Sequence, residues 1–162
     1  MEIGATKAVQ DRLKTTKIEE SKGASLVFCW DTHLTKIKGR NVLFIVNASN
    51  RYTIAMTDIE PRNWNYYAMY IIRVIHGMMQ EMGYSEEQIE QYFKMSGDTT
   101  ITKTHGRKSV GGINRMVMDA QYFGKKLEKE AKYQWELSEY LNRDICQPEG
   151  FDAYGYPSEL LN

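Results

Sequence analysis

The stretch Asn41-Val42-Leu43-Phe44-Ile45-Val46 decides the fold. Its unbroken run of branched and aromatic side chains predicts a strand that is buried on both faces and is therefore central in a sheet. The next four residues, Asn47-Ala48-Ser49-Asn50, are typical of a turn. Large and small side chains then alternate over residues 52–57, which predicts a second strand. The two strands should form an antiparallel hairpin covered by helices.

Two long helices are predicted to cover this sheet. Pro61 can open the first, and Gly83 can close it, so the first helix spans residues 61–83. The second has its apolar stripe over residues 113–142, with Ser109 as a candidate cap. Gly124 marks a break or kink in it.

Shorter elements are predicted around them. Thr6 can cap a helix that runs to Lys14, and Ser85 can open another with Gln88 as its capping-box partner. Residues 99–104 are rich in β-branched side chains and predict a short edge strand. The apolar spacing of residues 26–37 fits a helix better than a strand.

The length of 162 residues and the 42% apolar content match one ordinary domain. We therefore expect a single α+β domain over residues 1–145, in which long helices pack a small, mostly antiparallel sheet. Residues 146–162 form a C-terminal tail that contains Pro, Gly and the aromatic residues Phe151, Tyr154 and Tyr156. Two alternatives are open for this tail: it folds back over the domain, or it docks a partner.

Several classes of protein are excluded by composition. The longest apolar stretch, residues 64–82, contains Arg73 and His76, so we expect no membrane span. The N-terminus shows no secretory signal. Two cysteines, Cys29 and Cys146, cannot form a disulfide framework or a four-thiolate zinc site. We expect reduced thiols and a cytoplasmic protein.

The net charge is zero but unevenly distributed. Residues 1–51 and 99–143 each carry a net charge of +4, whereas residues 52–98 and 144–162 each carry −4. This balance argues against a globally basic nucleic-acid binder and leaves room for a local basic face. The alternative is that blocks of both signs mix in space and merely solvate the surface.

Catalytic motifs are absent from the sequence. No zinc-protease, Cys-x-x-Cys or nucleophile-elbow pattern occurs, and we expect no metal site and no cofactor. Glu86, Glu87 and Glu90 begin a short helix, where their charge favours the helix dipole without an ion. His105 is a weak candidate for a general acid, because no partner is fixed by spacing.

The most informative stretch is the glycine-broken basic segment from Lys103 to Arg115. Glycines allow backbone N–H groups to converge, and a helix N-terminus adds partial positive charge. The segment is thus a candidate site for an anion or a partner, with Lys103, Thr104, His105, Arg107, Lys108, Ser109 and Arg115 as its residues. The alternative is a plain connection whose cations pair with acidic residues of 81–90.

The order of these features resembles a family of small uncharacterised bacterial and mobile-element proteins, a domain of unknown function. The resemblance rests on Thr6-Lys7 with Leu13 behind it, Trp30, Leu43-Phe44-Ile45-Val46-Asn47, Lys103-Thr104-x-x-Arg107 and Ser109-Val110-x-Gly112. It covers about residues 1–120. Members of the family carry the motif Lys-Thr-x-x-Arg-Ser-Val-x-Gly-x-x-Asn. This sequence departs from it in two places: Lys108 separates Arg107 from Ser109, and Asn114 falls one position early when Gly112 is matched. The resemblance implies a compact α+β domain in the cytoplasm and no established reaction.

Three hypotheses of function follow. The first is a non-catalytic binding module whose basic loop contacts a phosphate-bearing or acidic macromolecule, either nucleic acid or an acidic protein. A second basic turn, formed by Lys36, Lys38 and Arg40, would help if the fold brings it near. The second hypothesis is a mobile-element protein that inhibits a host nuclease or defence protein, with the aromatic tail as the docking segment. The third is a hydrolase or nuclease that uses His105. Each of the three hypotheses is compatible with a homo-oligomer.

Overall fold

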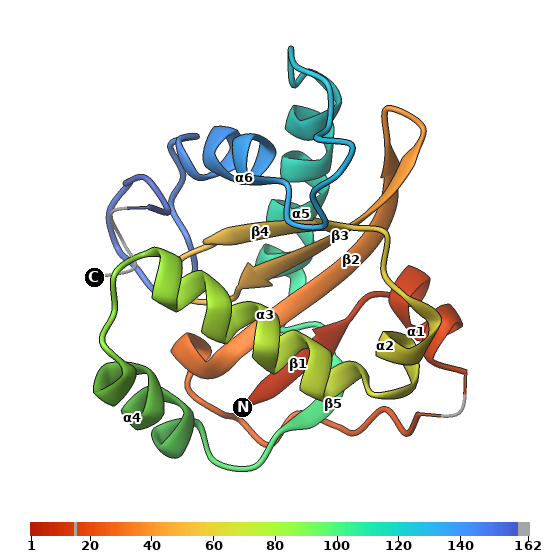
Figure 1. The fold of residues 1–162 in the computed structure, drawn as a ribbon. Helices are drawn as coiled ribbons and strands as arrows, with labels where there is room; N and C mark the ends of the chain where they lie inside the picture. Colours follow the sequence, from red (N-terminus) through yellow and green to blue (C-terminus); the bar gives the residue numbers. More distant parts are fainter. Residues whose placement is uncertain (15, 159–162) are drawn as a thin grey trace.

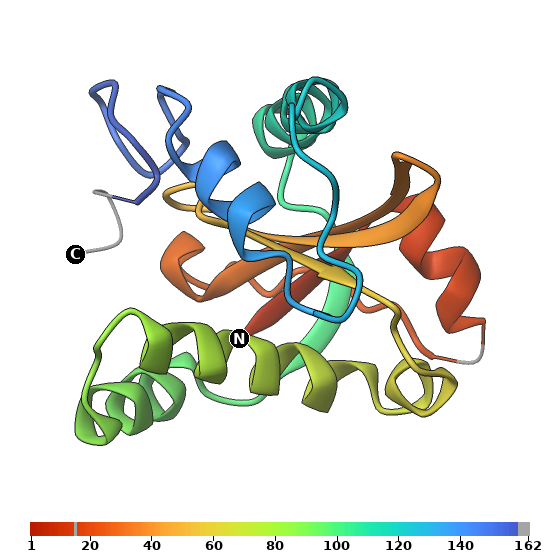
Figure 2. The same cartoon turned by 45° about the horizontal axis from the view of Figure 1, so that its top comes forward.

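The computed structural model describes residues 1–14 and 16–158. A sheet lies between two helical layers, with α3 and α4 on one face and α5 and α6 on the other (Figures 1 and 2). The elements in chain order are β1 (Glu2–Ala5), α1 (Lys7–Leu13), the 3₁₀ turn η1 (Leu26–Phe28), β2 (Cys29–Ile37), β3 (Arg40–Asn47), β4 (Thr53–Thr57), α2 (Pro61–Asn65), α3 (Tyr67–Glu81), α4 (Glu86–Ser96), β5 (Thr100–Lys103), α5 (Arg107–Gln121) and α6 (Trp135–Asn142).

The sheet has the strand order β4-β3-β2-β1-β5. The pairs β4–β3 and β3–β2 are antiparallel, whereas β1 runs parallel to both of its neighbours, β2 and β5. The α+β class is confirmed, and the sheet is mixed. The parallel half arises because the first residues of the chain insert between β2 and β5, which brings the N-terminus into the middle of the fold.

The alternation of side chains on β3 explains the two layers. Leu43 and Ile45 pack with α3 and α4 in one core, while Val42, Phe44 and Val46 pack with α5 and α6 in the other. All five side chains are at most 4% exposed. The prediction of a central strand over 41–46 is therefore confirmed, as is the hairpin with residues 53–57.

The helix predicted over residues 26–37 is wrong, since most of this segment is strand β2. A helical stripe would place Trp30 and Ile37 on one face, but Trp30 lies in the α3-side core and Ile37 in the α5-side core. Over so short a stretch, the apolar spacing fits both the helical period of about 3.6 residues and the strand period of two. Pairing with β1 and β3 on either side selects the strand.

The two long helices predicted from the sequence are each divided. The helix over 61–83 breaks at Tyr66 into α2 and α3. The helix over 113–142 is wrong as one element, because α5 ends at Gln121 and α6 begins only at Trp135. Ser109 lies inside α5, and Gly106 is the cap residue, with a φ of 94° that favours glycine.

The loop between α5 and α6 covers the free edge of β4. Thr57 N–H donates to the Lys132 carbonyl at 2.7 Å, and Gln134 N–H donates to the Ala55 carbonyl at 2.9 Å. From α6, the Asn142 side chain accepts from Thr53 N–H at 2.7 Å and donates to the Thr53 carbonyl at 2.9 Å. The edge of the sheet is thereby paired rather than exposed.

Within residues 1–14 and 16–158, no helix combines the length and the apolar character needed to cross a bilayer. Cys29 and Cys146 are both buried free thiols.

Asn142→Ala should lower the free energy of unfolding by about 2–3 kcal/mol, because two buried backbone groups of Thr53 lose their partner. Arg143→Ala is the matched control. Among the described residues this exposed side chain pairs only with Glu139, one turn away, so its loss should change stability by about 0.5 kcal/mol or less. Urea unfolding of both variants measures the difference. Equal stabilities of the two variants would contradict the edge-covering role.

Candidate functional site

The predicted basic segment divides into an outward and an inward set of side chains. Arg107, Lys108 and Arg115 are exposed on the outer face of α5. Lys103 is exposed as well and pairs with Glu20 at 3.0 Å. His105 and Ser109, by contrast, turn toward the sheet.

The outward cations are only lightly engaged. Lys108 Nζ donates to the Pro148 carbonyl at 3.4 Å, and Arg115 Nε lies 3.9 Å from Asp119. Among the described residues, Arg107 has no ion pair or hydrogen bond through its side chain. The alternative was that acidic residues of 81–90 neutralise these cations. The described ion pairs do not support it: Glu86 pairs with His76, and Lys103 and Arg115 pair with other carboxylates.

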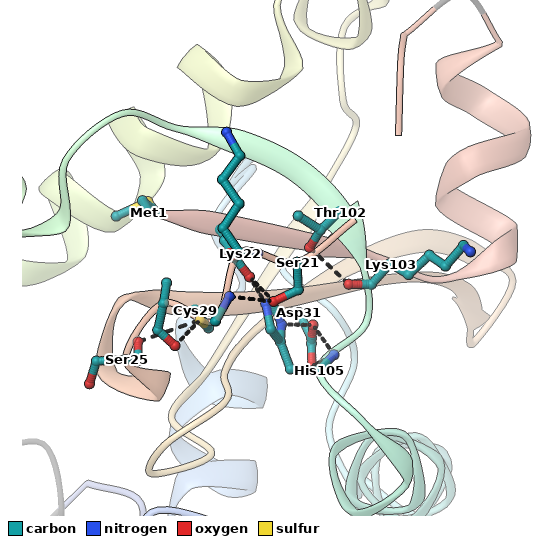
Figure 3. A network of polar contacts seen from close by, with 12 residues as sticks. Met1, Ser21, Lys22, Ser25, Cys29, Asp31, Thr102, Lys103 and His105 are labelled. Atoms are coloured by element: carbon teal, nitrogen blue, oxygen red, sulfur yellow. Dashed lines mark hydrogen bonds and ion pairs between the residues drawn. The ribbon is translucent and has the colours of Figure 1, made fainter. Parts of the chain in front are cut away.

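The inward set forms a buried network around Asp31 of β2 (Figure 3). His105 Nδ1 lies 2.7 Å from Asp31 Oδ1, and the backbone N–H of His105 donates to the same carboxylate at 3.2 Å. The Ser109 hydroxyl donates to the second oxygen of Asp31. Asp31 is fully buried, so these contacts replace the water that its charge would otherwise require.

The other ring nitrogen of His105 meets a second carboxylate. Nε2 lies 2.9 Å from Glu2 Oε2, and Glu2 also accepts from the Ser21 hydroxyl at 2.6 Å and from Lys22 N–H at 2.7 Å. The side chains of His105 and Glu2 are only 6% and 3% exposed. The imidazole is therefore clamped between two buried carboxylates.

Strand register explains why these distant residues meet. Glu2 pairs with Cys29 and Gly4 with Asp31 across β1 and β2, so all four share one sheet face, opposite to Ile3 and Trp30. Gly4 leaves the space that Asp31 fills: a Cβ at Gly4 would lie 1.8 Å from Asp31 Oδ1. The loop after β5 places His105 against this face of the sheet.

The charges in the network reinforce one another. Burial by itself would lower the pKa of His105, but the hydrogen bonds to Asp31 and Cys29 and the negative charge of Asp31 outweigh it and raise that pKa to about 10. Burial also opposes ionisation of Glu2, yet the hydrogen bonds from Ser21, Lys22 and His105 lower its pKa to about 2. At neutral pH an imidazolium thus lies between two carboxylates.

This arrangement bears directly on the hydrolase hypothesis. That hypothesis requires a carboxylate within hydrogen-bond reach of His105, and the structure provides two. It also requires access, whereas the ring is 6% exposed and both of its nitrogens are engaged. Because Asp31 and Glu2 occupy both ring nitrogens, the imidazole has neither a free N–H to donate to a substrate nor a lone pair to accept a proton from one. The geometry favours a structural clamp.

The second basic turn does not join the first segment. Gln121 Nε2 donates to the Lys36 carbonyl at 3.0 Å, and Lys38 Nζ donates to the Lys125 carbonyl at 2.8 Å, both at the C-terminal end of α5. Since α5 has 15 residues, the two groups lie about 20 Å apart. Arg40 is engaged by Asp58 at 2.5 Å.

The described part of the tail folds back on the domain. Gly150 N–H donates to the Ser49 carbonyl at 2.9 Å, and Cys146 and Gly155 form an antiparallel bridge. Phe151 lines a cavity of ≈ 370 Å³ together with Trp30 and Tyr92, among others. The last four positions of the predicted tail, residues 159–162, lie outside the described residues. Tyr154 and Tyr156 are exposed.

Sequence reasoning missed Glu2, Gly4, Cys29 and Asp31 as members of one site. Two features of the sequence pointed to a polar face. Asp31 interrupts an apolar stretch, and Glu2 and Gly4 alternate with Ile3, as residues on opposite faces of a strand do. Four residues are too few to predict strand β1, and without β1 the acidic residues have no common face.

Gly4→Ala should lower the free energy of unfolding by about 2–3 kcal/mol, because the added methyl group displaces Asp31 from His105. Gly77→Ala in α3 is the control, since its Cβ would meet nothing within 4 Å and should be neutral or stabilising by up to about 1 kcal/mol. Chemical denaturation compares the two. A Gly4→Ala protein as stable as Gly77→Ala would refute the close approach.

The clamp also predicts a pH dependence of stability. The pKa of His105 is raised in the folded state from 6.5 to about 10, so its contribution is complete below pH 6.5 and is lost as the pH rises toward 10. The pKa of Glu2 is lowered from 4.5 to about 2, so its contribution is complete above pH 4.5 and is lost as the pH falls toward 2. Stability from the clamp should therefore be greatest between pH 4.5 and 6.5.

Unfolding free energies at pH 5.5 and pH 9 measure the alkaline arm, where we expect a loss of about 1–3 kcal/mol. His105→Gln serves as the control and should show a smaller loss over the same interval, because the titrating ring is absent. Parallel pH profiles for the two proteins would show that another group titrates.

Comparison with known proteins places the chain in a family. A family model described as a domain of unknown function, DUF6933, matches residues 2–160. The match includes residues 121–160, which the resemblance inferred from the sequence had left outside. No curated protein and no solved structure matches the chain. The chain therefore belongs to the DUF6933 family, a domain of unknown function.

Proposed function

We propose that the chain is a non-catalytic binding module whose outer α5 face contacts a phosphate-bearing or acidic macromolecule. The observation that carries this proposal is the exposed guanidinium of Arg107, which has no side-chain partner among the described residues. It lies in the first turn of a 15-residue helix, next to the exposed Lys108. An anion at this place would meet two cations and the positive end of the helix dipole.

The exposed residues of α5 continue this face along the helix. Gly111, Arg115 and Met118 follow Arg107 and Lys108 at spacings of three to four residues. Asp119 is the only carboxylate of α5, and Arg115 faces it. The absence of a side chain at Gly111 leaves room for a partner to approach the helix backbone.

A second group of cations lies at the far end of α5. Lys36, Lys38 and Lys125 are exposed there, about 20 Å from Arg107. Phosphates recur along a nucleic-acid strand, so an extended polyanion could reach both groups, whereas a single small anion could not. This spacing favours a polymer as the partner.

The experiment is a binding titration with fluorescently labelled single- and double-stranded DNA and RNA over a range of salt concentrations. Arg107→Ala/Lys108→Ala should weaken binding about tenfold or more and reduce the slope of log K against log salt by about 2, because two phosphate contacts are lost. The matched control is Lys7→Ala/Lys94→Ala, which removes the same charge from exposed positions on α1 and α4. If the two double variants bind equally well, Arg107 and Lys108 do not form the binding site. If the wild type binds none of these polymers, nucleic acid is not the partner.

A contact with a protein, such as a nuclease or defence protein inhibited by a mobile-element product, is the second candidate function. Tyr154 and Tyr156 favour it, because exposed aromatic side chains often anchor interfaces, and they are 71% and 40% exposed. In the titration above, this candidate expects no binding to nucleic acid at any salt concentration. We place either function in the cytoplasm, where the free thiols of Cys29 and Cys146 would stay reduced.

A further inference from the structure

Three side chains of metal-ligand type converge on one buried point beneath the basic loop. An oxygen of Glu2, the sulfur of Cys29 and a ring nitrogen of His105 all lie within 4.8 Å of one another. They come from β1, from β2 and from the loop between β5 and α5, and Figure 3 shows Cys29 and His105 within one polar network. The proposed binding face on α5 uses none of them.

We propose that Glu2, Cys29 and His105 bind a divalent transition-metal ion of the Zn²⁺ type. A thiolate and an imidazole are the donors that Zn²⁺ prefers, and a carboxylate oxygen is its common third ligand. Ca²⁺ and Mg²⁺ take oxygen ligands, so the thiolate and the imidazole of this set argue against both ions.

The distances suit the ion with little rearrangement. Zn–N, Zn–O and Zn–S bonds of about 2.0–2.3 Å in a tetrahedral site place ligand atoms about 3.3–3.8 Å apart. His105 Nε2 and Glu2 Oε2 are 2.9 Å apart and need to separate by only a few tenths of an ångström. The sulfur of Cys29 lies within 4.8 Å of both, so it needs to approach them by about 1 Å at most.

Outer contacts orient the ligands as they do in known zinc sites. Asp31 holds His105 Nδ1 at 2.7 Å, which directs Nε2 toward Glu2 and Cys29. Asp31 is itself held by Ser109, and Glu2 is held by Ser21 and the Lys22 N–H. Glu2 and His105 are therefore positioned before an ion arrives, whereas the Cys29 thiol donates to the Ser25 carbonyl at 3.4 Å and gives up this contact on binding.

The charge balance also permits a metal ion to replace protons in this cluster. Binding releases one proton from the His105 imidazolium and one from the Cys29 thiol, so M²⁺ replaces two H⁺. The net charge of the buried cluster is the same before and after. The ion thus adds no uncompensated charge to a low-dielectric region.

The role of the ion follows from burial. Cys29 is fully buried, Glu2 and His105 are nearly so, and no substrate-sized molecule can reach them. An ion here would hold strands β1 and β2 to the loop that starts α5, which is a structural role. It would fix the base of the face from which Arg107 projects.

The experiment uses untagged protein that begins at Met1, because a histidine tag binds metal and the Met1 amino group bonds to the Asp98 carbonyl. The chain is first treated with a chelator and then titrated with CoCl₂ and ZnCl₂. We expect one Co²⁺ per chain with thiolate-to-cobalt charge-transfer absorption, and a rise of about 5 °C in Tm with excess Zn²⁺.

Cys29→Ser is the test variant, because it removes the sulfur ligand without leaving a buried charge unpaired. Cys146→Ser is the matched control, since Cys146 is the other buried free thiol. The charge-transfer band should persist in Cys146→Ser and vanish in Cys29→Ser, with affinity for Zn²⁺ at least tenfold weaker. Far-UV circular dichroism checks that both variants fold.

Glu2→Gln keeps the shape of the side chain but weakens it as a ligand, so it tests the site if Cys29→Ser does not fold. It too should weaken Zn²⁺ binding at least tenfold. The proposal is overturned if the wild type shows no charge-transfer band, if the band survives in Cys29→Ser, or if Glu2→Gln binds Zn²⁺ as tightly as the wild type does. None of these outcomes depends on nucleic-acid binding, so this inference and the proposed function can fail separately.

Discussion

The imidazolium of His105 lies between the carboxylates of Asp31 and Glu2, at 2.7 Å and 2.9 Å, and the arrangement of half of the sheet depends on this contact. A buried charge is costly unless it is paired and hydrogen-bonded, and removing one partner leaves the others uncompensated. Here the oxygens of both carboxylates also accept from hydroxyl and backbone N–H groups. The three ionised groups therefore stabilise one another only when β1, β2 and the loop before α5 are all in place.

The same contact decides which residues of the basic segment face the solvent. Because His105 and Ser109 are drawn inward by Asp31, the positions between them project outward at the start of α5. Arg107 and Lys108 occupy these positions. The exposed basic face and the buried acidic cluster are thus two sides of one short segment, and the candidate metal ligands lie directly below the candidate polyanion contacts.

The sheet itself has two distinct halves. Around β3, both faces are apolar and helices cover each of them. Around β1, one face is apolar through Ile3, while the other carries Glu2 beside Cys29 and Asp31 of β2. The apolar half stabilises the fold by burying hydrophobic side chains. The half with charged side chains on one face provides hydrogen-bonding groups and metal-ligand atoms. This asymmetry is why both the clamp and the candidate ion site lie on the β1 side.

The sequence by itself determined the elements whose patterns are local. The hairpin of β3 and β4, the capping box that opens α4 and the α+β class all follow from runs, alternation or cap residues within a few positions of one another. The basic loop was also visible, since its cations are close in the chain. Residues 26–37 were misassigned, because two periods fit so short a stretch equally well.

Only the tertiary structure decided what the basic loop does with its side chains. Asp31 and His105 are 74 positions apart, and Glu2 and His105 are 103 apart. No periodicity relates residues at such separations; they meet because β1 inserts in parallel between β2 and β5 and aligns Glu2 with Cys29 and Gly4 with Asp31. Side-chain patterns record which face of an element is buried, whereas strand register alone determines which distant charges share that face.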